Sequence, residues 1–578
     1  MIKQFFYKLG QSRFWLVFVL IALFGINYLA SVFHQRIDLT REKKFTLSKP
    51  TRQLLRSLAS PVTVDVFLKG EFPAGFKKLA VSVDEFLQEC KEISGGKLLI
   101  NFTEPLKDLD DSSAARFIDS MSYFYGIQAS TLQAPGKVGD EISFKRVIPG
   151  ALIHYRDTTV GVNLLKGVRS YGTEPEQLAA LYNDMEATLE YKFASAIQKA
   201  TSDKRPLIGY VKGNGEAWGY NVDDAVRTLV KEYRVDTVNL ATDRFIPSIF
   251  DALVMIKPVQ KFDDQEKLKL DQYLMRGGKI FCLLDILYDG FDSLYQKDGF
   301  IAYDRGLNLE DQLFRYGVRI NQALLEDMQC DKLPQVSGQA GQQQQTRLVD
   351  WPIFPVLNGT DHPISKNLDG IRAMFPSTID TVTAPGIRKT ILLQSSANAR
   401  VVPTPERVSF DFMQIAPDIR EFDQKNIPVA VLLEGSFRSL FANRLPAAMA
   451  DTLANAYHTP FLAEATPGAK MIVVADGDIA LNQVSQSEGP LPMGMNLFTH
   501  IPYANKEFYE NALDYLVNPS GILETRAKDY TLRLLDPRKV RNSKSKWQLI
   551  NIAVPILLIM IIGFLFQQVR KRKYAVKA

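Results

Sequence analysis

Three aspartates lie where two apolar runs of the chain end. Asp285 closes FCLLD, and Asp476 and Asp478 lie in VVADGD, two runs typical of buried strands. Because open α/β sheets bind ligands outside the carboxyl ends of their parallel strands, these carboxylates are candidates for a cation or ligand site. Glu216, in the turn GNGE, is a fourth candidate. The same residues would also serve turns and helix caps, and the sequence leaves both interpretations open.

No other residue pattern predicts catalysis or a cofactor. The string ISGGK, at 93–97, is similar to the LSGGQ signature of ABC ATPases, but the chain lacks a GxxxxGK[ST] motif to bind phosphates. Cys282 lies inside a predicted strand rather than in a strained elbow, and no GxSxG occurs. The five histidines show no metal-ligand spacing. We therefore predict that the chain is not an enzyme, and we assign it no catalytic, cofactor-binding or metal-binding residue.

The region that must position the carboxylates, residues 206–520, is predicted to be a doubly wound, amidotransferase-like α/β domain. Apolar strands alternate with helices from PLIGYVKG to KIFCLLD, the pattern of a parallel sheet covered on both faces. Asp263 and Glu266 have capping-box spacing at one helix start. The later runs TILLQSS, IPVAVLLEG and KMIVVADGD either complete this sheet or form a third layer. The Gln-rich stretch 335–347 has no apolar anchor and is predicted to be an exposed loop, either inert or a flap over a site.

Residues 36–203 are predicted to form an α/β domain of their own. Their patterns follow the order β-α-β-α-β-β-α, with a hairpin turn at Arg156 and Asp157. This order is typical of a thioredoxin-like domain. The chain has three widely spaced cysteines and no CxxC, so the catalytic pair of that fold is missing. We predict the thioredoxin-like fold without its chemistry.

Two uncharged apolar stretches, 14–33 and 549–566, flank these domains and are predicted to be transmembrane helices. A cleaved signal peptide is the alternative for the first stretch, although Tyr28 would fit the −3 position of the cut poorly. Two spans place the tails 1–13 and 567–578 on one side. Because these tails are short, we expect them in the cytoplasm. We therefore predict an inner-membrane protein with a large periplasmic region and a juxtamembrane segment at 521–546.

Polar and small residues inside the two spans are candidates for helix packing. The first span contains Gly25 and Asn27, and the second contains Asn551 near its start. An amide side chain is costly in lipid unless it meets a partner, so these positions could face the helices of another membrane subunit. The alternative is that both asparagines lie at the depth of the membrane interface and hydrogen-bond water.

Composition indicates folded, soluble material between the spans. Charged residues make up 23% and hydrophobic residues 46% of the chain, close to the averages of globular proteins. The net charge of +5 owes much to the two tails. It therefore does not indicate binding to nucleic acid.

Several long motifs resemble a known family. RIDLTREKKFTLSKPTRQLL, at 36–55, is similar to a segment of the auxiliary proteins of ABC-2-type transporters. LEYKFASAI, LDQYLMRGGK, LNLEDQLFRYGVRIN, VLLEGSFRSLF and LRLLDPRKV resemble the gliding-motility, or GldG, branch of that family in Bacteroidetes. The resemblance covers nearly the whole chain. It implies two partners, an ABC permease and a cytoplasmic ATPase, and it offers no catalytic residues and names no cargo.

Three hypotheses follow from these observations. The first is a non-catalytic accessory subunit whose periplasmic domains bind a partner or transmit motion driven by ATP hydrolysis. The second is a solute-binding module with its ligand at the strand ends near Asp285 and Asp476. The third is an envelope enzyme of the amidotransferase or hydrolase type. A closed pocket converging on those aspartates would favour the second, and an exposed Cys282 beside a histidine would favour the third.

Overall fold

The computed structural model of the 578-residue chain describes residues 46–527 and 537–574, together with some residues between 17 and 28. Within 46–527 the undescribed positions are 71, 73, 108, 136–141, 165–174, 203, 291–293, 295–298, 341–342, 411–417, 447–450 and 457–458. The contacts divide the chain into one compact unit that ends at Lys528 and a second that begins at Asp529.

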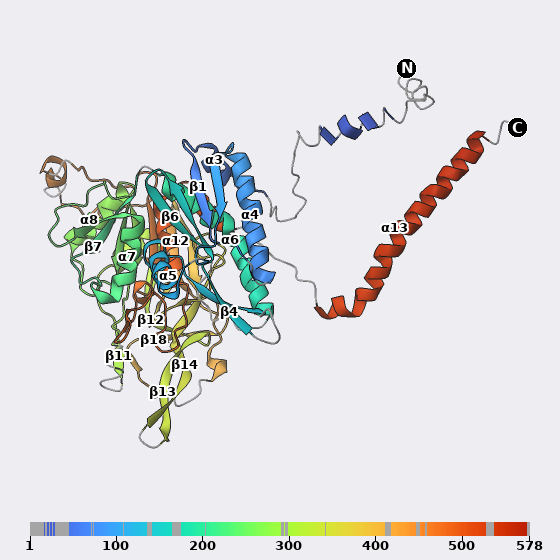
Figure 1. Ribbon diagram of the computed structural model, residues 1–578. Helices are drawn as coiled ribbons and strands as arrows, with labels where there is room; N and C mark the ends of the chain where they lie inside the picture. The colour runs from blue at the N-terminus through green and yellow to red at the C-terminus, as the bar shows by residue number, and fades with distance from the viewer. Residues whose placement is uncertain are drawn as a thin grey trace. The chain divides into compact units, whose positions relative to one another are not determined.

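The amino-terminal part of the first unit is built on a four-stranded sheet (Figure 1). In sheet order its strands are β2 (Leu98–Phe102), β1 (Val62–Val66), β5 (Gly150–Tyr155) and β6 (Thr158–Asn163). The strands β1 and β2 are parallel, and the other pairs are antiparallel. The helices of this part are α3 (Lys49–Arg56), α4 (Ala74–Ile93), α5 (Asp111–Tyr125) and α6 (Pro175–Thr201). Valines of β1 and leucines of α4 share one buried core.

The predicted order of elements is present in this part, with one addition. The hairpin of β5 and β6 turns at Arg156 and Asp157 as predicted, and Arg156 takes up a positive φ of 51° that such a tight turn requires. The sequence analysis did not predict a second hairpin, formed by β3 (Ser130–Pro135) and β4 (Ile142–Val147). It lies between α5 and β5 in the chain.

A larger sheet of ten strands organises the rest of the first unit. Along the sheet, its strands are β13 (Cys330–Ala340), β14 (Gln343–Gly359), β17 (Ile387–Gln394), β20 (Pro428–Gly435), β21 (Lys470–Val474), β10 (Lys279–Leu283), β9 (Ala252–Ile256), β7 (Leu207–Lys212) and β8 (Arg234–Asn239), with β15 (Ile371–Arg372) paired to β14. The later apolar runs therefore complete the sheet rather than form a third layer.

The prediction of a parallel sheet is right for one half and wrong for the other. The strands from β21 to β8 are parallel, whereas β20, β17, β14 and β13 run antiparallel to their neighbours. Parallel neighbours need a crossover connection, usually a helix, which α7 (Asp223–Glu232) and α8 (Asp264–Met275) provide. The described residues between β17 and β20 contain no α-helix. A buried apolar run is compatible with either direction, so the sequence pattern did not reveal this change.

Helices cover the sheet through large apolar side chains. Helix α8 begins with the predicted capping box, in which Asp263 accepts a hydrogen bond from the Glu266 backbone N–H and the Glu266 side chain bonds back. Helix α12 (Asn505–Val517) places the ring of Tyr509 5.6 Å from that of Phe281 in β10.

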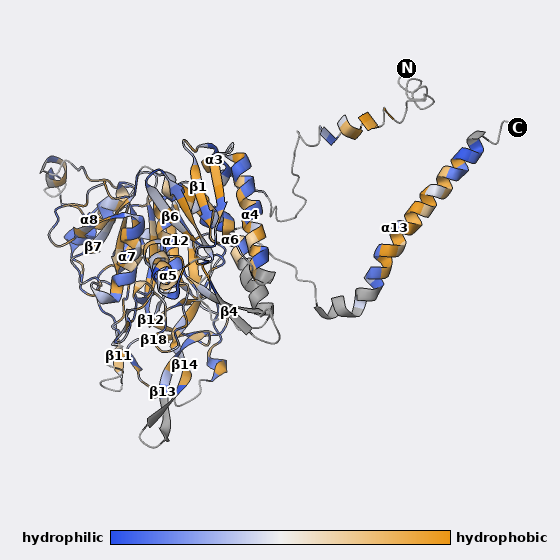
Figure 2. Ribbon diagram, viewed as in Figure 1, coloured by the Kyte–Doolittle hydropathy of each residue, from blue (hydrophilic) through white to orange (hydrophobic). Residues whose placement is uncertain are grey.

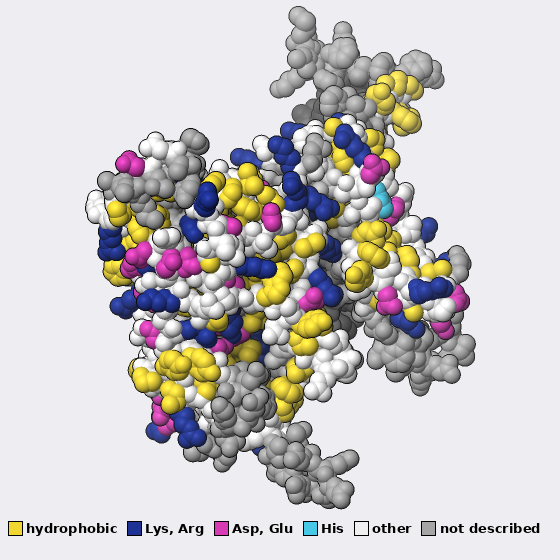
Figure 3. Space-filling view, turned by 90° about the vertical axis from the view of Figure 1, so that its left-hand side faces the viewer, with side chains coloured by type: hydrophobic (Ala, Val, Ile, Leu, Met, Phe, Trp, Pro, Cys, Tyr) yellow, Lys and Arg dark blue, Asp and Glu magenta, His cyan; other side chains and the backbone are white. Residues whose placement is uncertain are grey.

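Figure 3 shows one face of the molecule, where hydrophobic side chains form patches separated by Lys, Arg, Asp and Glu.

The described residues of the Gln-rich stretch, 335–340 and 343–347, form strands rather than a loop. They make the distal part of the ladder between β13 and β14, with Gln335 paired to Arg347 and Ala340 paired to Gln343 (Figure 1). The ladder joins backbone N–H and C=O groups, so a polar, low-complexity sequence can make it without an apolar anchor. The prediction from composition was wrong for that reason.

Smaller elements complete the first unit. A three-stranded sheet has the order β16 (Ser377–Thr381), β12 (Val318–Asp327) and β18 (Ala399–Pro403), and helix α10 (Glu310–Tyr316) precedes β12. The pairs β11 (Phe300–Ala302) with β19 (Glu406–Val408) and β22 (Val484–Ser485) with β23 (Gly489–Pro490) are antiparallel. Short 3-10 helices are η1 (Tyr220–Val222), η3 (Ile419–Glu421), η5 (Asp478–Ala480) and η6 (Ile522–Ala527), and η4 (Thr452–Ala456) is a π-helix.

The second unit contains one long helix, α13 (Pro537–Tyr574). The most apolar 18-residue window of its segment Lys546–Arg572 has a mean hydropathy of 2.8, and the segment is long and apolar enough to cross a membrane. Figure 2 shows this hydrophobic band bounded by hydrophilic ends. The predicted second span, 549–566, lies within it. The predicted first span, 14–33, lies partly outside the described residues.

Candidate functional site

The predicted aspartates meet at one edge of the large sheet. The strands β9, β10 and β21 are adjacent and parallel, so their carboxyl ends lie together. Asp285 follows β10, while Asp476 and Asp478 follow β21. One carboxylate oxygen from each of these three residues lies within 4.8 Å of the others. The three strand-end carboxylates therefore lie close together.

A lysine that the sequence analysis missed lies among them. Lys257 follows β9 directly and has a positive φ of 49°. Its Nζ lies 2.9 Å from Asp285 Oδ2, 2.6 Å from Asp478 Oδ1 and 2.5 Å from Asp289 Oδ2. We call these four residues, together with Asp476 and Arg305, the strand-end cluster.

Backbone amides and a second cation bind four more oxygens of the cluster, whereas Asp478 Oδ2 is buried without a hydrogen-bond partner among the described residues. Gly477 N donates to Asp285 Oδ1 at 2.5 Å, and the N–H groups of Asp478 and Met374 donate to the two oxygens of Asp476, each at 2.7 Å. Arg305 Nη2 donates to Asp289 Oδ1 at 2.8 Å. The cluster thus joins the loops after three strands to the segment around Arg305.

Burial determines the charge state of the cluster. Desolvation raises the pKa of Asp478 to about 7 and that of Asp285 above its usual value, although the Lys257 ammonium opposes both shifts. The pKa of Asp476 lies well above its usual value because of burial and the neighbouring aspartates. Burial disfavours the Lys257 ammonium, but the carboxylates around it outweigh that cost and raise its pKa. Lys257 is therefore charged, while burial favours the protonated forms of Asp285, Asp476 and Asp478.

The cluster acts as an internal ion-pair network rather than as an open cation site. The Lys257 ammonium contacts two of the three aspartates that could ligate a cation. A divalent ion bound there would share the space with this fixed positive charge and be repelled by it. The residues present therefore do not fit a resident metal while Lys257 is in place.

The fourth candidate, Glu216, lies in the turn after β7 and serves that turn. Its Oε2 accepts a hydrogen bond from Asn214 N at 2.9 Å, and burial raises its pKa. The Asn214 side chain in turn donates to Glu266 Oε2 at 2.9 Å, which ties the turn to the start of α8. These contacts fit a structural role in the turn.

Cys282 has none of the features of a nucleophile. It lies in the middle of β10 with 1% of its surface exposed, and burial raises its pKa strongly. A thiol becomes nucleophilic as the thiolate, which this environment disfavours. Cys282, Cys90 and Cys330 are all free thiols. The exposed cysteine beside a histidine that the enzyme hypothesis requires is therefore not found at Cys282.

Comparison with known proteins decides the family. Residues 205–512, more than half of the chain, match the family ABC_transp_aux, described as an ABC-type uncharacterized transport system. The chain belongs to this family. The matched region contains the whole strand-end cluster and begins just before β7. The family is an auxiliary component of ABC transport, so the resemblance seen in the motifs is confirmed at the level of the family.

Two other comparisons add less. Residues 41–154 match a domain of unknown function, DUF7088, which covers most of the part built on the four-stranded sheet. A solved structure described as the mmIFT52 N-terminal domain is 13% identical over 54% of this chain and 97% of that chain, with a TM-score of 0.29. Such a score is too low to establish a shared fold. No curated protein matches the chain.

Proposed function

We propose that this ABC_transp_aux member is a non-catalytic, membrane-anchored accessory subunit of an ABC transporter, of the GldG type associated with gliding motility. The family match over residues 205–512 carries this proposal. The helix at Lys546–Arg572 supplies the anchor. Its partners are an ABC permease and, through the permease, a cytoplasmic ATPase. The folded part binds a partner or transmits motion, with residues 36–203 as a thioredoxin-like domain without a cysteine pair and 206–520 as the doubly wound domain.

The two ends of the described compact unit support an anchor on each side of it. Ser48 N, just after the chain enters this unit, donates to Glu190 Oε1 of α6 at 2.7 Å. Near its other end, Ser520 Oγ donates to Gln198 Oε1 of the same helix at 3.2 Å. A Cβ placed on Gly521 would lie 3.6 Å from Pro50 Cγ, so α3 and the start of η6 are neighbours. Both ends of the unit therefore leave it beside α6, as two spans in one membrane would require.

We expect the region from Arg36 to Lys546 to be periplasmic and both tails to be cytoplasmic in the inner membrane. Protease added to intact spheroplasts should then digest the folded region and leave epitope tags on the two tails intact. Detergent permeabilisation, as the control, should expose the tags. Protection of the folded region while the tails are cut would reverse this topology.

The spans themselves are proposed to recognise the permease. Asn551 is exposed on the surface of α13, and Gly25 and Asn27 are exposed on the other apolar stretch. Amide and small side chains at a helix surface in lipid favour close packing and hydrogen bonding with another helix. These three residues are therefore the proposed contact positions.

Replacing 14–33 and 549–566 with polyleucine helices of equal length should abolish co-purification with the permease while insertion and folding persist. A matched variant with polyleucine spans that keep Gly25, Asn27 and Asn551 should recover much of the interaction. The measurement is affinity purification from detergent-solubilised membranes, with the permease quantified by immunoblot. A fully polyleucine variant that still co-purifies and supports function would show that the spans are generic tethers.

The solute-binding alternative loses its proposed site in this structure. Its ligand was expected at Asp285 and Asp476, where the Lys257 ammonium and backbone amides already occupy the carboxylate oxygens. The accessory role needs no ligand there. It is therefore the function that we favour.

A further inference from the structure

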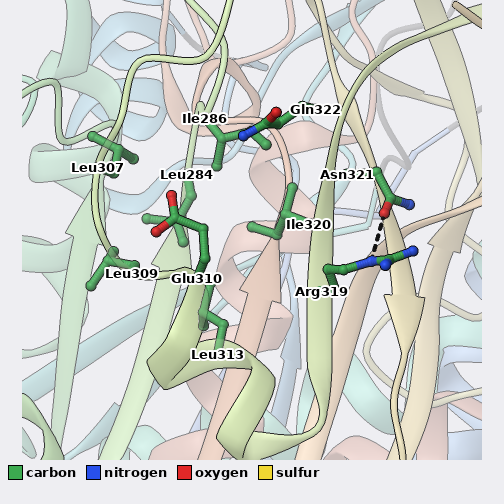
Figure 4. Close-up of a pocket in the computed structure, with 10 residues that line it drawn as sticks. All are labelled: Leu284, Ile286, Leu307, Leu309, Glu310, Leu313, Arg319, Ile320, Asn321 and Gln322. Carbon is green, nitrogen blue, oxygen red and sulfur yellow. Dashed lines mark hydrogen bonds between the residues drawn. The ribbon is translucent and has the colours of Figure 1, made fainter. Parts of the chain in front are cut away.

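A cavity of about 400 Å³ lies beside the strand-end cluster (Figure 4). The loop after β10, the segment before α10, α10 itself and the start of β12 enclose it. Its floor consists of six buried aliphatic side chains: Leu284, Ile286, Leu307, Leu309, Leu313 and Ile320. This volume is within the range of small-ligand sites, which are mostly apolar with a few polar groups that set orientation.

One carboxylate above this floor has no counter-charge. Glu310, in the first turn of α10, lines the cavity and is exposed, and its side chain has no ion-pair or hydrogen-bond partner among the described residues. The adjacent Asp311 differs, because its Oδ1 lies 2.6 Å from Lys267 Nζ. Glu310 is thus the acidic group of α10 that has no partner in the described part of the chain.

The nearest cation in the cavity wall is already engaged elsewhere. Arg319 Nη2 lies 2.7 Å from Asp380 Oδ2, and its Nε donates to Asn321 Oδ1 at 3.0 Å. Figure 4 shows the Arg319 guanidinium turned toward Asn321, on the other side of β12 from the Glu310 carboxylate. The cavity therefore combines an aliphatic floor with a single unbalanced negative charge.

We propose that this cavity binds an aliphatic chain that ends in an ammonium group, with Glu310 as its counter-ion. The chain would cover the leucine and isoleucine floor, and the ammonium would lie at the exposed carboxylate. A lysine side chain of a partner polypeptide and a free alkylamine share this chemistry. The site is separate from the proposed membrane contacts, so it can fail while the accessory role stands.

The floor of this cavity also connects to the strand-end cluster. Leu284 and Ile286 line the cavity, while Asp285 between them pairs with Lys257 on the other side of the same segment. Arg305, in the segment that leads to Leu307, donates to the Leu287 carbonyl at 3.1 Å and to Asp289. A bound ligand would thus contact the loop after β10 and the segment before α10, which the strand-end cluster holds in place from the other side.

Isothermal titration of the full-length protein in detergent with butyl-, pentyl- and hexylammonium chloride tests the proposal. Affinity should rise about fourfold per added methylene, which is the factor that corresponds to ~0.8 kcal/mol per buried CH₂. Glu310→Gln should weaken hexylammonium binding about tenfold, and added salt should weaken binding to the natural sequence.

Leu313→Phe, which reduces the space above the aliphatic floor of the cavity, should reduce the dependence of affinity on the length of the alkyl chain. A Gly-Gly-Lys-Gly-Gly peptide that binds more tightly than pentylammonium identifies a polypeptide source, and the reverse order identifies a free amine.

Two controls make the result decisive. Glu488→Gln removes an exposed glutamate in the turn between β22 and β23 and should leave binding unchanged. 1-Hexanol, which has the chain but no charge, should bind much more weakly than hexylammonium. Equal binding of the alcohol and the amine, an unaffected Glu310→Gln variant, or no binding of any alkylammonium would each overturn the proposal.

Discussion

Lys257→Met should lower the free energy of unfolding of the full chain by about 3–5 kcal/mol, the cost of removing one partner of a buried ion pair. The ammonium contacts Asp285, Asp289 and Asp478, and its side chain is 15% exposed. Methionine preserves much of the volume and removes the charge. The four carboxyl groups of the cluster would then lie close together with only Arg305 as a cation, and only Asp289 contacts it.

Urea unfolding of the detergent-solubilised protein, followed by tryptophan fluorescence, measures this loss. Lys425→Met, at an exposed position, is the matched control and should change stability by less than about 0.5 kcal/mol. Adding Asp478→Asn to Lys257→Met should recover part of the loss, because it removes one of the carboxylates left unpaired. A Lys257→Met variant as stable as the Lys425→Met control would contradict the ion-pair network described here.

That Asp285 and Asp476 follow strands could be predicted from the apolar runs that precede them. Their approach to one another could not, because the sequence left open whether KMIVVADGD joins the sheet, and only the structure places β21 beside β10. The partner that defines their role could not be predicted. In the sequence, Lys257 follows the apolar run DALVMI and looks like an ordinary solvent-exposed lysine at the end of a strand. Only the spatial order of β9, β10 and β21 shows that it faces the aspartates.

Sequence motifs predicted the structure correctly where the interactions that form it lie within a few residues of one another. The capping box of Asp263 and Glu266 and the turn at Arg156 follow from interactions within a few residues. The Gln-rich hairpin at 335–347 and the reversed strands β17 and β20 depend instead on which backbone lies alongside, and side-chain pattern carries little of that information. The cavity at Glu310 was missed for a similar reason, because its floor comes from three stretches of the chain, at 284–286, 307–313 and 320.

The pH dependence of stability should reveal the charge state of the cluster. In the unfolded chain an aspartate loses its proton near pH 4. Burial raises the pKa of Asp478 to about 7 in the folded protein, so between these values the folded state binds more protons than the unfolded state. Its contribution to stability therefore falls as pH rises from about 4 to about 7 and is constant above that.

Between pH 5 and pH 8, the natural protein should lose about 2–3 kcal/mol of unfolding free energy relative to Asp478→Asn, from ~1.36 kcal/mol per pKa unit over about two units. Comparing the two proteins at each pH cancels the contributions of other groups, such as Glu510, whose pKa burial also raises to about 7, and His362, whose pKa burial lowers to about 4. Asp361→Asn, at a fully exposed side chain, is the matched control. Because the neighbouring Asp285 carboxylate helps to raise the pKa of Asp478, Asp285→Asn should reduce the same dependence. A difference between the natural protein and Asp478→Asn that stays constant from pH 5 to pH 8 would show that Asp478 is ionised throughout, with Lys257 alone balancing the cluster.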